Sequence, residues 1–304
     1  MLRDAGHAVT GLDVAPGPET QIVGSVADRA VVDRAFSCGI EAVIHAGALH
    51  KPDIARYPTQ SFIDTNITGT LNLLNAALCA RHDRFIYTST TSVMINQAIR
   101  DETSDVAVWL DETACPLHPR NIYGITKLAA EGLCRLYSIQ HAMNCMVLRT
   151  SRFFPEDDDT HRTLSGENQK ANEFLYRRLT VEDAAQAHIL ALDRAGALGS
   201  DTFVLSAPTP FKPEDVRDLK RDAANVIARY FPDAPHLYAR QGWKLPKSIG
   251  RVYDAGMPRS DLDFEAKLTL AACCQRLEMD RGCHLLMIRA THPLRRLLSA
   301  RGTG

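Results

Sequence analysis

The stretch that decides the fold is Arg84-Phe85-Ile86-Tyr87-Thr88, which is followed at once by Ser89-Thr90-Thr91-Ser92. Its first part is apolar and aromatic without a turn residue, which predicts a strand that is buried on both faces. The hydroxyl residues then fall at the carboxyl end of this strand, where open α/β sheets bind their ligands. Taken alone, residues 89–92 fit an ordinary Ser/Thr-rich turn equally well.

Further apolar strands alternate with helical segments on both sides of this stretch. Strands are expected at 8–13, 41–45 and 144–149, and helices at 27–36, 58–79 and 123–141. Apolar strands that are separated by helices indicate a parallel sheet covered on both faces. The sequence therefore predicts a doubly wound α/β fold.

The chain changes character after Phe154. A polar stretch runs to about Lys170, a helix at 181–195 and a strand at 202–205 follow, and the sequence is rich in proline from Pro208 onward. This pattern predicts a smaller α+β lobe laid over one edge of the sheet. The expected division is a sheet domain at 1–155 with 171–206 returning to it, a lobe at 156–170 and 207–275, and a basic tail at 276–304.

Composition excludes several classes of protein. The 304 residues are 45% hydrophobic, and 35 basic side chains nearly balance 36 acidic ones, so excess charge does not disorder the chain. The chain lacks the basic surplus typical of nucleic-acid binders, a membrane-spanning apolar run and a signal peptide, so we expect a cytoplasmic protein. Eight cysteines and eleven histidines show no zinc spacing, so we expect buried free thiols and no metal.

Tyr123 and Lys127 stand one turn apart on the same face at the start of a predicted helix. A phenol has a pKa of about 10, which is too high for a base at neutral pH. A neighbouring ammonium lowers that pKa and makes the tyrosine a usable proton acceptor. Together with the strand-end hydroxyls, this pair forms a set that suits hydride transfer.

These motifs resemble those of the extended short-chain dehydrogenase/reductases of the NAD-dependent epimerase/dehydratase type, a family that includes UDP-galactose 4-epimerase. The resemblance runs over about residues 2–264. The matching segments, in the family's order, are 43–48, 66–74, 85–90, 121–127 with Glu131, 148–151 and 179–183. It implies a Rossmann-type NAD-binding domain, a C-terminal substrate-binding lobe, and a sugar or nucleotide sugar as the small-molecule substrate.

The resemblance also implies roles for individual residues. Tyr123 would be the general base, and Lys127 would lower its pKa and bond the nicotinamide ribose. Thr90 would orient the substrate hydroxyl, while Asn66 would hold the local backbone or a water. Asp13 would bond the adenosine ribose and repel a 2′-phosphate, so NAD is expected over NADP. Other expected cofactor contacts are Ser25, Val26, Ala46, Gly47, Ala48, Thr88 and Ser151, and expected substrate contacts are Ser89, Thr90 and Arg152.

Three departures from the family's pattern bear on the ligands. Ser25 places a hydroxyl where many relatives have an aspartate against the adenine. Arg152 stands where nucleotide-sugar relatives usually have Asn, which favours an anionic group on the substrate or, about equally, an ion pair with the acidic run 156–159. The segment 94–110 is longer than usual and leaves the active-site strand, so we expect it to shape the substrate pocket.

The largest departure from the family's pattern is at the N-terminus, where the family has a Gly-rich loop between its first strand and first helix. Residues 10–17 imitate that loop, but Val14 takes the middle glycine position and prolines stand where the helix should begin. Residues 2–6 instead predict the end of the first helix, with Gly6 as its C-cap. We expect the first strand, the loop and most of the first helix to be missing from the chain as written, through a misplaced start codon or a real loss, and NAD to bind weakly.

Two functions stay open at this point. The first is an NAD-dependent oxidoreductase or epimerase acting on a sugar or nucleotide-sugar hydroxyl. The alternative is an inactive relative that serves as a binding or regulatory protein after loss of the cofactor loop. The intact Tyr123, Lys127 and Thr90 favour the enzyme, and the altered N-terminal segment favours the inactive relative. Relatives often dimerise through the two helices that here hold Asn66 and Tyr123, so the family implies a possible homodimer.

Overall fold

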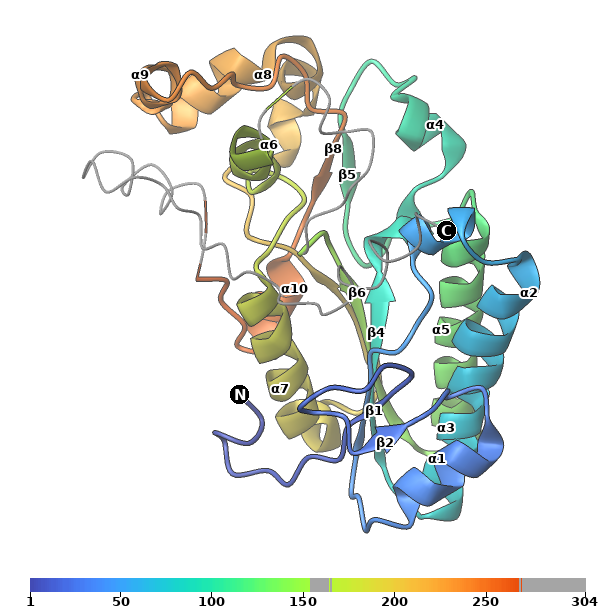
Figure 1. The fold of residues 1–304 in the computed structure, drawn as a ribbon. Helices are drawn as coiled ribbons and strands as arrows, with labels where there is room; N and C mark the ends of the chain where they lie inside the picture. Colours follow the sequence, from blue (N-terminus) through green and yellow to red (C-terminus); the bar gives the residue numbers. More distant parts are fainter. Residues whose placement is uncertain (154–163, 165, 268, 270–304) are drawn as a thin grey trace, which may run out of the picture.

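The computed structural model describes residues 1–153, 164, 166–267 and 269 (Figure 1). The expected basic tail and the acidic run 156–159 lie outside the described residues. The elements follow in this order: β1 (Leu12–Asp13), β2 (Ile22–Val23), α1 (Arg29–Phe36), β3 (Val43–His45), η1 (Lys51–Ala55), α2 (Thr59–Phe62), η2 (Ile63–Thr68), α3 (Gly69–Cys79), β4 (Arg84–Thr90), η3 (Thr91–Met94), α4 (Gln97–Asp101), β5 (Val108–Leu110), α5 (Ile122–His141), β6 (Asn144–Thr150), α6 (Gly166–Glu173), α7 (Val181–Leu198), β7 (Asp201–Leu205), η5 (Pro213–Asp215), α8 (Val216–Tyr230), α9 (Ala234–Arg240), β8 (Arg251–Tyr253) and α10 (Gly256–Asp261).

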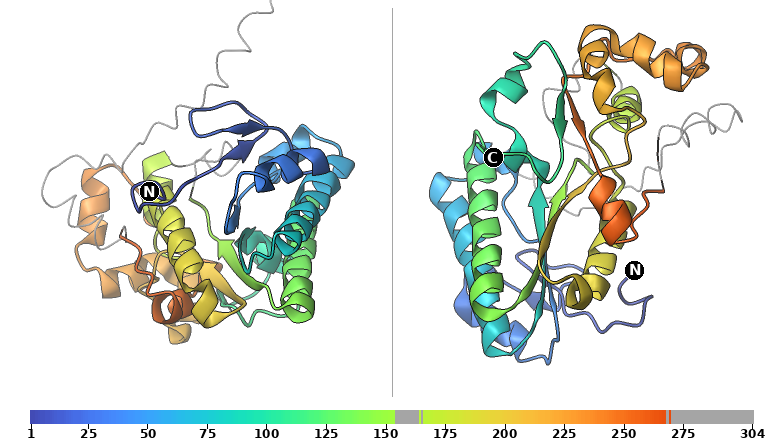
Figure 2. Two further views of the ribbon diagram at one scale, coloured as in Figure 1. Left: turned by 90° about the horizontal axis from the view of Figure 1, so that it is seen from below. Right: turned by 180° about the vertical axis from the view of Figure 1, so that it is seen from behind.

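Four parallel strands form the central sheet in the order β3-β4-β6-β7. Helices α1, α3 and α5 cover one face and α7 covers the other (Figures 1 and 2). Alternation along β4 explains the two layers, because Phe85 and Tyr87 pack with α3 and α5 while Ile86 packs with α7. The doubly wound α/β fold is confirmed, and the strand ends of β4 and β6 are aligned with Thr90 opposite Thr150.

The predicted strand at 8–13 is shorter than expected, since only Leu12 and Asp13 are paired, with β2 in a separate two-stranded sheet. The reason is local: the Gly11 amide donates to Gln21 Oε1 at 2.6 Å, and the Gly11 carbonyl accepts from the amides of Gln21 and Ile22. The Gln21 side chain thus occupies the Gly11 amide, where a longer ladder would need a backbone carbonyl.

Residues 2–6 form a turn and not an assigned helix, but the cap predicted at Gly6 is present. Gly6 has φ +89°, and the amides of Gly6 and His7 donate to the carbonyls of Arg3 and Leu2 at 3.0 and 3.1 Å. These two bonds form the Schellman pattern that ends helices.

The long predicted helix at 58–79 is continuous but changes its winding. It begins as α2, widens into a π-helical turn over η2, and returns to α-helix in α3. The wide turn carries Asn66, which is buried against the loop after β3. Wide turns of this kind often mark functional sites.

The segment 94–110 supplies α4 and β5. Strand β5 pairs in parallel with β8, and the Ile249 amide just before β8 donates to the Leu219 carbonyl of α8, so this segment links the sheet end to the C-terminal elements. Of the described cysteines, Cys134 and Cys145 are buried, whereas Cys38, Cys79 and Cys115 are exposed, contrary to expectation. Among the described residues, none of the helices has the length and apolar character that crossing a membrane requires.

Candidate active site

A cavity of about 130 Å³ opens at the carboxyl ends of β4 and β6. The strand-end hydroxyl residues Thr88, Thr90 and Ser151 line it together with Tyr123. Parallel strands bring these residues together from segments far apart in sequence, which is why the ligand site lies at this edge.

Helix α5 positions the phenol and the ammonium. Its N-cap, Asn121, accepts a hydrogen bond from the Gly124 amide at 3.0 Å, which fixes the first turn that carries Tyr123. Lys127 is 2% exposed, and its Nζ donates to the Thr88 carbonyl at 2.5 Å. Burial lowers the pKa of Lys127 to about 7, although the nearby Glu131 carboxylate opposes this change.

Three imidazoles surround this lysine. The pKa values of His45, His50 and His188 are all lowered, first by burial and then by the positive charge of Lys127. The His50 ring lies against Tyr123, with 5.6 Å between ring centroids. With these imidazoles neutral, Lys127 is the titrating basic group on the helix that also carries Tyr123.

Thr88 and Thr90 differ in how their hydroxyls are held. Thr88 Oγ1 lies 2.7 Å from His188 Nε2, and His188 Nδ1 lies 2.7 Å from the Ala184 carbonyl. Thr90 Oγ1 accepts from the Ser92 amide at 3.2 Å, so its own hydrogen is available to a ligand in the cavity that it lines.

Ser89, an expected substrate contact, is among the residues that line the cavity, but its hydroxyl is turned toward α5. Its hydroxyl donates to Glu131 Oε1 at 2.5 Å, and Glu131 is paired with Arg149 at 2.8 Å. The cause is strand alternation, which turns Ser89 toward α5 when Thr88 and Thr90 face the other way. Its hydroxyl is therefore part of the buried support beneath the site.

Asn66 holds the backbone of the loop after β3. Its side chain accepts from the Leu49 amide at 2.8 Å and donates to the Leu49 carbonyl at 3.1 Å and to Thr126 Oγ1 at 3.0 Å. It thereby ties residues 46–50 to α5.

The expected cofactor residues lie along successive strand ends. The Gly24 amide donates to the Asp13 carbonyl at 2.9 Å, which places Ser25 and Asp13 side by side. Val26 packs near Gly47, joining this corner to the loop Ala46-Gly47-Ala48 after β3. At the other end, the buried Ser151 Oγ makes no hydrogen bond within the described part of the chain, although it lines the cavity. An orphaned hydroxyl there fits a bound polar group such as the nicotinamide end of NAD.

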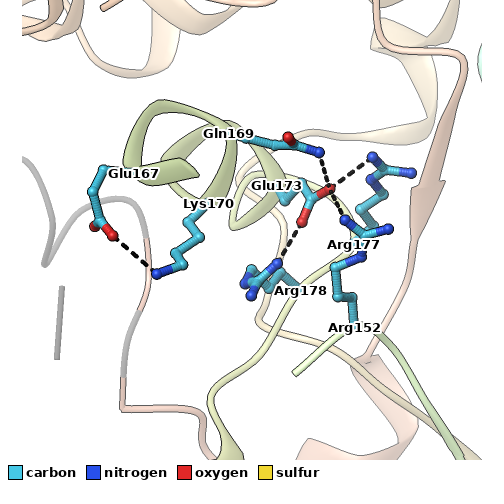
Figure 3. A network of polar contacts seen from close by, with 7 residues as sticks. All are labelled: Arg152, Glu167, Gln169, Lys170, Glu173, Arg177 and Arg178. Carbon is cyan, nitrogen blue, oxygen red and sulfur yellow. Dashed lines mark hydrogen bonds and ion pairs between the residues drawn. The ribbon is translucent and has the colours of Figure 1, made fainter. Parts of the chain in front are cut away.

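Arg152 has a partner that the sequence did not suggest. Its Nη1 donates to Glu173 Oε1 at 3.2 Å, and Arg177 and Arg178 donate to the same carboxylate at 2.7 and 2.6 Å (Figure 3). Burial alone would raise the pKa of Glu173, but the three arginines together hold it below its usual value. Arg152 and Arg177 also line the cavity.

Sequence reasoning missed several cavity residues, among them His50, Arg100, Arg120 and Arg251. The arginines come from α4, the turn before α5 and β8, so no single motif unites them. The unusual length of 94–110 was the available signal, and Ile95 and Arg100 from this segment do line the cavity.

Comparison with known proteins shows the family to which this chain belongs. The family model described as NAD dependent epimerase/dehydratase matches residues 1–205. GDP-6-deoxy-D-mannose reductase of Pseudomonas aeruginosa is 38% identical over 233 residues, which are 70% of this chain and 73% of that protein. L-arabinose 1-dehydrogenase (NAD(P)(+)) of Haloferax volcanii is 30% identical over 45% of this chain, which spans about half (54%) of that relative.

Solved structures share the fold. A short-chain dehydrogenase/reductase superfamily protein from Agrobacterium tumefaciens with bound NAD has a TM-score of 0.61 at 24% identity, covering 92% of this chain and 94% of that one. UDP-N-acetylglucosamine 4-epimerase from Bacillus cereus has a TM-score of 0.60 at 20% identity, covering 92% of each chain. With two thirds of its length matched by the family model, this chain belongs to the NAD-dependent epimerase/dehydratase family of enzymes, whose cofactor is NAD.

Proposed function

We propose that this chain is an NAD-dependent oxidoreductase or epimerase that acts on a hydroxyl of a sugar or nucleotide sugar. The observation that carries the proposal is the meeting of Tyr123 and Thr90 in one cavity, with the Lys127 ammonium buried behind them. The central sheet would hold the cofactor, and the C-terminal elements would hold the substrate.

In the proposed reaction, Tyr123 accepts the proton of the substrate hydroxyl as the neighbouring carbon gives up a hydride, and bound NAD supplies the acceptor for that hydride. Thr90 donates a hydrogen bond to the same substrate oxygen and fixes its position. The positive charge of Lys127 stabilises the phenolate form of Tyr123. Asn66 holds the loop after β3 against α5.

The residues that would hold NAD fall into two groups. Thr88, Ser151 and Lys127 would contact the nicotinamide end, while Asp13 and Ser25, which lie together, would contact the adenosine end. Residues 10–17 contain β1 and a bend that leads toward β2, and no helix begins there to offer amides for the pyrophosphate.

The experiment that tests the function measures NADH formation from a panel of free sugars, uronates and nucleotide sugars, with chromatography of the products to detect epimers. We expect turnover with at least one sugar-containing substrate. Folded protein that turns over none of them would favour the inactive relative instead.

Asp13→Ala is expected to narrow the preference for NAD over NADP by roughly tenfold, the value of one charge-assisted hydrogen bond. Asp13 Oδ1 also accepts from the Ala15 amide at 2.8 Å, so the matched variant is Asp13→Asn, which keeps an oxygen for that turn but loses the charge. Fluorescence titrations with both cofactors measure the ratio. Tighter binding of NADP by the unchanged protein would contradict the ribose assignment.

We also propose a homodimer through α5. Ile125, Ala129, Gly132, Leu136 and Ile139 are exposed at alternating spacings of four and three residues, and the three large side chains are 50%, 42% and 72% exposed. Such a seam suits a second copy of the same helix. Ile139→Glu is expected to convert a dimer into a monomer in light scattering after gel filtration, whereas Ile54→Glu, outside α5, should leave the mass unchanged.

A further inference from the structure

The ammonium of Lys127 is buried without a carboxylate partner. Among the residues that the structure describes, no acid lies within ion-pair distance of its Nζ. Glu131, one turn further along α5, is paired with Arg149 at 2.8 Å and accepts from Ser89 Oγ at 2.5 Å. A buried cation needs compensation, because burial removes the water that would stabilise its charge. Other groups must therefore stabilise the charge of Lys127.

Two neighbouring residues of β4 hold this ammonium. Lys127 Nζ donates to the Thr88 carbonyl at 2.5 Å, and it lies over the ring of Tyr87, 4.3 Å from the ring centroid. The face of an aromatic ring carries partial negative charge and attracts a cation within about 6 Å, most strongly where water is excluded. Tyr87 is 1% exposed, so solvent does not screen this attraction.

The hydroxyl of Tyr87 does not take part in this contact. It is buried and makes no hydrogen bond within the part of the chain that the structure describes. Burial raises the pKa of Tyr87 well above its usual value, so this phenol stays protonated and is not a second base. Tyr87 thus acts on Lys127 through the face of its ring, which a phenylalanine would also present.

Other titratable groups approach Lys127 from three further elements and from its own helix. They are Tyr123, Glu131 and Cys134 on α5, His45 on β3, His50 in the loop after β3, and His188 on α7. The three imidazoles have lowered pKa values and are neutral, and the pKa of the Cys134 thiol is raised well above its usual value. Glu131 is the one carboxylate in this set, and its charge is shared with Arg149.

We propose that Tyr87 is a positioning residue for the reaction, whose ring face holds the Lys127 ammonium in its charged form on the helix that carries Tyr123. The proposal rests on the proposed function, in which that charge stabilises the phenolate of Tyr123. Without the ring, burial would favour the neutral amine, and Tyr123 would lose the charge that lowers its pKa.

The test is an NMR titration of Lys127 in the full chain with isotope-labelled lysine, its signal assigned by its loss in Lys127→Arg. Tyr87→Phe keeps the ring, whereas trifluorophenylalanine at the same position keeps the shape of the ring but withdraws electrons from its face. We expect the titration midpoint of Lys127 to be unchanged in Tyr87→Phe and to fall by roughly one pH unit in the fluorinated variant. Equal midpoints in these two variants would overturn the proposal.

Trifluorophenylalanine at Phe85 is the matched control. Phe85 is fully buried and packs on the same face of β4 as Tyr87, but no cation lies over its ring among the described residues. Fluorination there should leave the Lys127 midpoint unchanged. A fall equal to that seen at position 87 would show a general effect of the core and would also overturn the proposal.

The position of the ring gives a second readout that needs no activity. The ε-methylene protons of Lys127 should resonate at unusually high field in the unchanged protein and in Tyr87→Phe, because they lie near the ring face. Tyr87→Leu should remove this displacement. Ordinary chemical shifts in the unchanged protein would overturn the contact itself.

The role in the reaction is tested by the pH dependence of kcat/KM at saturating NAD. If the ring keeps Lys127 charged, the fall of the rate on the alkaline side should move to lower pH in the fluorinated variant, by as much as the Lys127 midpoint moves. An unmoved profile would overturn the positioning role. Failure of the proposed function is distinguishable: a midpoint that follows the ring in protein without turnover removes that function, whereas turnover with a midpoint that ignores the ring removes this proposal alone.

Discussion

Tyr123→Phe is expected to lower turnover at least ~100-fold, the usual contribution of a positioned general base. The variant removes one oxygen and keeps the ring that packs at 5.6 Å against His50, so neither the fold nor the cavity shape should change. The measurement is the steady-state rate on whichever substrate the panel identifies, with NAD affinity recorded in parallel.

Tyr57→Phe is the control for this variant. Tyr57 is 49% exposed and lies outside the cavity lining, so the same chemical change there should leave turnover intact. Near-normal turnover in Tyr123→Phe, at an unchanged free energy of unfolding, would remove the base assignment even if the protein proved to be an active enzyme.

The second large effect concerns stability, and it comes from Glu173. This carboxylate is 1% exposed and forms ion pairs with Arg152, Arg177 and Arg178 (Figure 3). Glu173→Gln leaves the buried Arg178 and the half-buried Arg152 and Arg177 around a neutral amide, and removal of one member of a buried ion pair costs about 3–5 kcal/mol. We expect urea unfolding to show a loss of that size in the free energy of unfolding at neutral pH.

The same helix supplies the control. Glu167 pairs with Lys170 at 2.9 Å, three residues apart on α6, and both side chains are partly exposed. Glu167→Gln should therefore cost no more than about 0.5 kcal/mol. Equal losses in the two variants would show that the arginine cluster does not depend on Glu173.

Acid should reduce the difference between the unchanged protein and Glu173→Gln. The folded pKa of Glu173 lies below its ordinary value of 4.5, so its stabilising contribution is present above that pH and is lost as the pH falls through the folded pKa. Unfolding measured at neutral pH and again well below pH ~4 should give a large and then a small difference in free energy.

The fold was predictable from sequence because its signals are local. The run of apolar residues in β4 and the helical spacing of α5 each specify one element, and parallel pairing then follows from their alternation. Asn66 and Thr90 could be located for the same reason, as each sits at a fixed place in a continuous motif.

The rest of the site depends on side-chain direction and on long-range contacts. Ser89 lies in the same row of hydroxyls as Thr90, and only the phase of the strand turns it toward Glu131. Arg152 finds its partner 21 residues away, on a helix whose position the sequence did not give. Arg120 and Arg251 meet because β5 pairs with β8, and strands of three residues leave little trace in a sequence.

The hydrogen bond between Thr88 and His188 also determines which kind of ligand group the Thr88 hydroxyl can bind. A carbonyl can only accept, so the ring nitrogen facing Ala184 must carry the hydrogen, and the neutral ring then presents a lone pair to Thr88. The Thr88 hydroxyl therefore donates its one hydrogen to that lone pair. Toward the cavity, its oxygen can only accept a hydrogen bond. Any ligand group that binds this hydroxyl from the cavity must therefore be a hydrogen-bond donor. A hydroxyl or an amide NH₂ can bind there, whereas a carbonyl or carboxylate oxygen cannot.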